Sequence, residues 1–132
     1  MRRRTPAALL AAVALAVAAC SAPGTGDAGG NGAVAIGPFD GASITVEAVN
    51  LQFEPSIVTM PSGRPLRLVL DNKDAGVPHD IHVFQGDTDY GVSSIVIGPG
   101  LTEVRFGPLT AARYSFECTI HPEMDGEIVV TP

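Results

Sequence analysis

The chain has 132 residues, with 8 basic and 14 acidic side chains and a formal net charge of −6. A chain this short rarely contains more than one folded domain. Without the three arginines at positions 2–4, 5 basic and 14 acidic residues remain, giving a net charge of −9. This negative charge argues against a nucleic-acid partner and against electrostatic adhesion to anionic lipid, and it favours a basic partner surface.

The first 20 residues, "MRRRTPAALLAAVALAVAAC", have the pattern of an export signal. Three arginines precede an apolar run from Ala7 to Ala19, and Cys20 follows. This order is typical of a secretory signal peptide, and the run is shorter than the roughly 20 residues needed to span a bilayer as a helix. The ending "VAAC" resembles a bacterial lipobox, in which the signal is cut before a cysteine that becomes lipidated. We therefore predict a signal peptide over residues 1–19 and a lipidated Cys20.

A lipidated Cys20 anchors the protein to the outer face of the cell membrane or to a periplasmic leaflet. The alternative is an ordinary secretory signal with Cys20 near the cut by chance. With Cys20 acylated, Cys118 has no cysteine partner, since the chain has only two cysteines. An exported free thiol is open to oxidation unless something occupies it, and a metal ion is one such occupant.

Residues 20–42 are rich in Gly, Ala, Ser and Pro and have no hydrophobic period. They are predicted to form a flexible tether, with an edge strand over Val34–Phe39 as the alternative. Residues 43–132 are predicted to form one domain.

Short stretches of alternating apolar and polar residues follow one another through this domain, separated by Gly and Pro, with no helical period. This pattern predicts an all-β fold, a sandwich or barrel of about seven strands. The stretches are "SITVEAVNLQF", "SIVTM", "PLRLVLDN", "HDIHVF", "SSIVI", "LTEVRF", "ARYSFEC" and "GEIVVT".

The stretch "CTIHPEM" connects the last two predicted strands and contains Cys118, His121 and Met124. A cysteine, two histidines and a weak axial methionine form the ligand set of blue-copper sites. The second histidine must then be His79 or His82. Side chains three apart in a regular strand point to opposite faces, and His79 begins its strand, so His79 is the preferred candidate.

The stretches "YSFECTIHPEM", "GEIVV" and "VPHDIHVF" closely resemble the cupredoxins, especially the amicyanin and plastocyanin branch, over residues 43–132. The resemblance implies an eight-stranded Greek-key β-sandwich with one type 1 copper ion. It makes His79, Cys118 and His121 the equatorial ligands and Met124 the axial ligand. It also places Tyr114 in the packed strand that leads to the cysteine.

Two residues beside the expected ligands depart from the family pattern. Asp80 stands where the family commonly has an asparagine that ties the two ligand loops together, and Thr119 can donate a hydroxyl hydrogen bond to it. An ionised Asp80 favours the more positive, oxidised metal, so Asp80→Asn is expected to raise the reduction potential. Glu123 adds a second negative charge where amicyanin has an aromatic residue.

Each expected ligand also has an ordinary explanation. Cys118 can be a small buried side chain, Met124 can fill the core, and His121 can be a polar loop residue. Zinc is the main alternative metal because it also binds Cys and His.

These features predict a membrane-anchored, monomeric carrier of single electrons that uses one copper ion and is not an enzyme. His121 is the expected electron port, and a small apolar patch around it is expected to dock redox proteins transiently. The alternative is a copper-binding module for trafficking or sequestration that does not cycle electrons.

Overall fold

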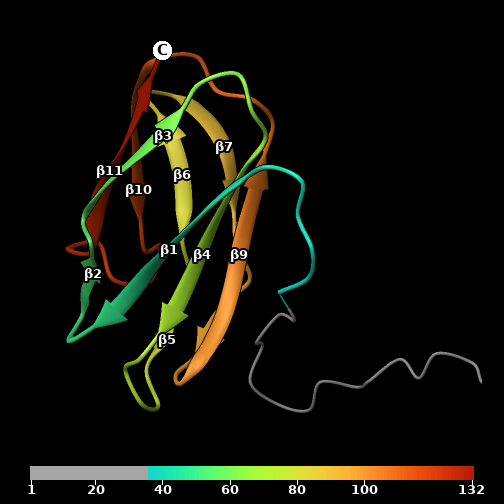
Figure 1. Cartoon of the computed structure of the whole chain (residues 1–132). Coiled ribbons are helices and arrows are strands. Elements are labelled where there is room, and N and C mark those ends of the chain that lie inside the picture. Colours follow the sequence, from blue (N-terminus) through green and yellow to red (C-terminus); the bar gives the residue numbers. More distant parts are fainter. Residues whose placement is uncertain (1–35) are drawn as a thin grey trace, which may run out of the picture.

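The computed structural model describes residues 36–132, and this range contains 11 strands and no helix (Figure 1). The predicted signal peptide, Cys20 and most of the tether lie outside the described residues. Within residues 36–132, no helix is long and apolar enough to cross a membrane.

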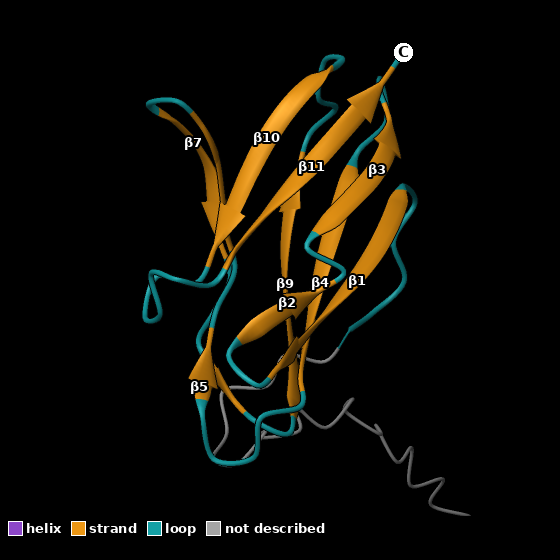
Figure 2. Cartoon of the chain, turned by 90° about the vertical axis from the view of Figure 1, so that its left-hand side faces the viewer, coloured by secondary structure: helices purple, strands orange, loops and turns teal. Residues whose placement is uncertain are grey.

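Two sheets pack face to face. The first sheet has the order β2 (Gln52–Glu54), β1 (Ala42–Val49), β4 (Leu66–Asn72) and β9 (Gly100–Phe106). The second has the order β3 (Ile57–Pro61), β11 (Asp125–Thr131), β10 (Ala112–Glu117), β6 (His82–Gln85) and β7 (Thr88–Val92). The pairs β1–β4 and β3–β11 are parallel, and the others are antiparallel. A short ribbon of β5 (Pro78–His79) and β8 (Val96–Ile97) lies at one end (Figure 2).

The core lies between the sheets because alternate residues of each strand point inward. Leu66, Leu68 and Leu70 of β4 are fully buried, and Phe116 and Ile128 face them from β10 and β11. Burying each such side chain contributes about 1.5–3 kcal/mol. Tyr114, expected in the packed strand, is also buried.

Three details differ from the expected strands. The first predicted strand is a hairpin, because Asn50 and Leu51 both adopt left-handed conformations, with φ of 54° and 60°, and reverse the chain between β1 and β2. The stretch "HDIHVF" breaks between β5 and β6. Strand β7 was not expected, since it is short, mostly polar and lies at a sheet edge.

Residues just before position 43 also take part in the described structure. β1 starts at Ala42, and the alternative edge strand over Val34–Phe39 is not formed by its described residues 36–39. Instead, the carbonyl of Gly37 accepts a hydrogen bond from Arg67 (2.6 Å). The guanidinium carbons of Arg67 and Arg105 lie 5.2 and 5.5 Å from the centre of the Phe39 ring.

Candidate metal centre

Three potential metal ligands from distant parts of the chain meet at one end of the sandwich. His79 ends β5, Cys118 follows β10, and His121 lies in the loop between β10 and β11. Nδ1 of His79 lies 3.2 Å from Nδ1 of His121. Sγ of Cys118 lies 3.8 Å from Nδ1 of His79 and 3.6 Å from Nδ1 of His121. His79 and Cys118 are buried, whereas His121 is partly exposed.

These three atoms can bind one metal ion. A triangle with sides of 3.2, 3.6 and 3.8 Å has a point about 2 Å from every corner, which is a normal metal–nitrogen distance in proteins. A thiolate is a soft donor and imidazole is intermediate, so the set suits copper or zinc better than the oxygen-seeking cations. Among residues 36–132, this is the one cluster of three or more His, Cys, Asp or Glu side chains with such geometry.

Backbone hydrogen bonds hold the loop from Cys118 to Met124 in a compact turn. The amide of Met124 donates to the carbonyl of His121 (2.9 Å), and the amide of Cys118 donates to the carbonyl of Met124 (3.0 Å). Pro122 has a fixed φ, which further stiffens the loop. The Met124 side chain is buried, 1% exposed, and its role as the axial ligand stays a prediction.

The ribbon that carries His79 is fastened to β4 by Asn72. This buried amide donates from Nδ2 to the carbonyl of Val77 (2.8 Å) and to that of Val96 (2.9 Å), which is the residue opposite His79. Both strands of the ribbon are therefore held by one side chain, and the His79 ring projects from a rigid support.

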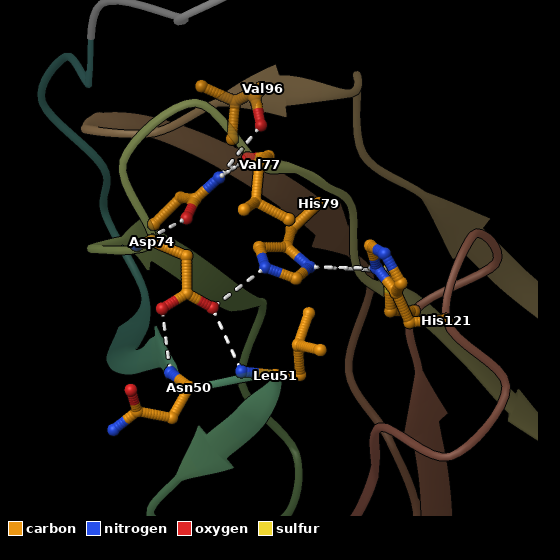
Figure 3. Close-up of polar contacts among 9 residues, drawn as sticks. Asn50, Leu51, Asp74, Val77, His79, Val96 and His121 are labelled. Carbon is orange, nitrogen blue, oxygen red and sulfur yellow. Dashed lines mark hydrogen bonds and ion pairs between the residues drawn. The ribbon is translucent and has the colours of Figure 1, made fainter.

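Asp74 contacts the far side of the His79 ring and was missed in the sequence analysis. Its Oδ2 lies 3.1 Å from Nε2 of His79, and its carboxylate accepts hydrogen bonds from the amides of Asn50 (2.6 Å) and Leu51 (2.9 Å) (Figure 3). Burial alone would raise the pKa of Asp74. The hydrogen bonds from Leu51, Asn50 and His79 outweigh this effect and lower the pKa below its ordinary value of 3.8. Asp74 is thus ionised at neutral pH.

Comparison with known protein families places this arrangement in context. Residues 7–130 match the model of the cupredoxin-like domain. The chain belongs to the cupredoxin-like family. No curated protein sequence matches it.

Solved structures similar to this cupredoxin include auracyanins and amicyanin. Auracyanin A, a blue copper protein from Chloroflexus aurantiacus, is 17% identical with a TM-score of 0.61, and the match covers 68% of this chain and 98% of auracyanin A. For auracyanin B the values are 19% identity, a TM-score of 0.63, and coverage of 78% and 97%. A reduced Cu(I) form of an amicyanin mutant is 24% identical with a TM-score of 0.53, covering 71% and 86%. These similarities confirm the predicted all-β sandwich.

In this cupredoxin, Asp80 joins the two stretches that carry the potential ligands. Its carboxylate accepts a hydrogen bond from the amide of Thr119 (2.7 Å) and a second one from the Thr119 hydroxyl, as expected. Asp80 directly follows His79, and Thr119 directly follows Cys118. This pair therefore holds the His79 and Cys118 stretches together, while its effect on a bound metal stays a prediction.

His82 lies outside the donor cluster. Its ring nitrogens lie 3.3 Å from carboxylate oxygens of Glu117 and of Asp89, and its ring stacks on Phe84 at 5.3 Å. Residues 80–81 interrupt the extended strand between β5 and β6, so the two histidines belong to different sheets. The structure therefore brings His79, rather than His82, to Cys118 and His121.

Apolar side chains surround the exposed part of His121. Leu51 is 49% and Ile120 37% exposed. Together with Pro122, Glu123 and Met124 they line a shallow depression beside His121. We call Leu51, Ile120, His121 and Pro122 the His121 patch.

Proposed function

We propose that this cupredoxin carries single electrons and binds one type 1 copper ion through His79, Cys118, His121 and Met124. The observation that supports this proposal is the convergence of one sulfur and two imidazole nitrogens within 3.8 Å of one another. Copper supplies the reversible one-electron change when bound.

The surroundings of the donors suit such a carrier. Asn72 holds the His79 ribbon, and backbone hydrogen bonds hold the loop of Cys118 and His121. Donors that stay in place in both charge states keep the structural cost of electron transfer low. The partly exposed His121 ring gives electrons a path to the surface, and the small His121 patch suits a brief encounter with a redox protein.

The experiment that tests this function is the visible and electron-spin spectrum of the copper-loaded, oxidised protein. An intense blue band with narrow copper hyperfine splitting is expected, and Cys118→Ser should abolish both signals. The matched control His82→Ala should retain them, because His82 lies outside the cluster. A colourless protein with an ordinary copper signal would reject the carrier and favour copper trafficking or sequestration.

We also propose that the protein acts as a monomer outside the cytoplasmic membrane, anchored through lipidated Cys20, with a redox protein and not a substrate as its partner. Membrane fractionation of the full chain and of Cys20→Ala tests the anchor. The wild type is expected in the membrane fraction and the variant in the soluble one.

A further inference from the structure

Asp74 receives hydrogen-bond donors on both carboxylate oxygens. Oδ1 accepts from the amide of Asn50, and Oδ2 accepts from the amide of Leu51 and faces Nε2 of His79. A carboxylate that is ionised offers only acceptors, so the 3.1 Å contact with Nε2 favours the tautomer of His79 that has its proton on Nε2. Nδ1 then presents its lone pair, and this is the atom that faces Cys118 and His121.

Asp74 is itself held from several sides. The consecutive left-handed residues Asn50 and Leu51 aim their two amides at one carboxylate, an arrangement known to bind anions. The amide of Asp74 donates to Oδ1 of Asn72 (3.0 Å), the side chain that also fastens the His79 ribbon. The Asp74 side chain is 13% exposed and the His79 side chain is fully buried. The carboxylate therefore has little freedom to leave His79.

We propose that Asp74 is the positioning residue for the copper site, fixing the tautomer and the ring orientation of His79 and placing a carboxylate behind it. This inference rests on the proposed copper ligation by His79. A carboxylate behind a metal-bound histidine increases the basicity of the ligand. Its negative charge also stabilises the more positive, oxidised copper, so it holds the reduction potential down.

A purely structural Asp74 would only hold the turn at Asn50 and Leu51. Such a residue would affect stability and leave the His79 ring unchanged. The two roles are separable because the ring tautomer can be observed without any metal.

The test compares the wild-type protein with Asp74→Ala, Asp74→Asn and the matched control Asp71→Asn. Asp71 lies on β4 and pairs with Lys73, so its substitution removes the same charge from this end of the strand without removing a partner of His79. Nitrogen NMR of the copper-free proteins reports the His79 tautomer, and metal titration and voltammetry report the Kd for Cu(I) and the reduction potential.

The wild type and Asp71→Asn should have the proton on Nε2 of His79, whereas Asp74→Ala should populate the Nδ1-protonated form. Asp74→Ala should also weaken copper binding by about 10- to 100-fold, against less than twofold for the control. An unchanged tautomer and Kd in Asp74→Ala would overturn the proposal.

If Asp74→Ala does not fold, Asp74→Asn decides the question, because it keeps the side-chain shape and removes the charge. Its potential should rise above that of Asp71→Asn, and equal potentials would reject the positioning role. A wild type with no blue band but a tautomer that responds to Asp74→Ala would reject the proposed function alone. A blue wild type with no response in any Asp74 variant would reject this inference alone.

Discussion

The two histidines of the candidate copper site are supported in opposite ways. His79 is fully buried, projects from the β5–β8 ribbon, and has Asp74 on its second ring nitrogen. His121 is partly exposed on a loop, and within residues 36–132 its Nε2 has no hydrogen-bond partner. The comparison teaches that one side of the site can fix the geometry while the other side gives access. A site closed on both sides would have more protein between the metal and a docked partner.

Removal of each ring tests this difference most severely. His121→Gly leaves a gap that opens to solvent, so added imidazole should restore the blue spectrum of the copper-loaded protein. His79→Gly leaves a gap that is closed to solvent, because the His79 side chain is fully buried, so imidazole should restore little or none of the blue spectrum. Absorption titrations with imidazole provide the measurement. Equal recovery in the two variants would contradict the comparison.

A substitution at Gly126 tests the side of the site formed by the loop that carries His121. It lies opposite Phe116 in the β10–β11 pair, and a Cβ at this position would overlap the Phe116 ring and the carbonyl oxygen of Ser56. Gly126→Ala should therefore lower the free energy of unfolding by about 1–3 kcal/mol, as expected for overpacking. Gly107→Ala is the matched control, since nothing lies within 4 Å of its added Cβ. Denaturant unfolding measures both, and similar losses would show that the crowding at Phe116 is relieved cheaply.

Asp80 connects the two sides of the site, because its hydrogen bonds from Thr119 join the stretch that carries His79 to the stretch that carries Cys118. Asp80→Asn removes a negative charge near the thiolate, so the reduction potential should rise by about 40 mV, equivalent to about 1 kcal/mol for one electron in partly screened surroundings. Voltammetry measures the change, with Asp87→Asn as the exposed control. An unchanged or lower potential would remove Asp80 from the residues that tune the copper.

The smallest expected effect is the contribution of Asp74, on the His79 side of the site, to the pH dependence of the free energy of unfolding of the metal-free protein. The pKa of Asp74 is lower in the folded chain than its ordinary value of 3.8. The ionised carboxylate therefore stabilises the folded state at pH values above 3.8. This contribution is lost as the pH falls through the lower, folded pKa. Asp74→Asn should therefore be less stable than the wild type at pH 7, and the gap should narrow below about pH 4. A gap that is constant with pH in urea unfolding would contradict this linkage.

Much of the fold and the donor cluster was predictable, because alternation in β4 and β10 reports directly which face is buried. The spacing of Cys118, His121 and Met124 identified one loop, and strand geometry favoured His79 over His82. The turn at Leu51 was not predicted from the sequence, because leucine rarely adopts positive φ. The role of Asp74 was missed for the same reason, since its partner Asn50 lies 24 residues away and only the folded turn brings the two together.

The contacts of Arg67 and Arg105 with the Phe39 ring fix where the first described residues lie on the domain. Arg67 lies near the start of β4, whereas Asn72, beside the His79 ribbon, ends the same strand. They are five positions apart in an extended strand, which corresponds to about 17 Å. The described residues that contact Arg67 and Arg105 therefore lie toward the end of β4 opposite the His79 ribbon, away from the proposed docking surface at the His121 patch.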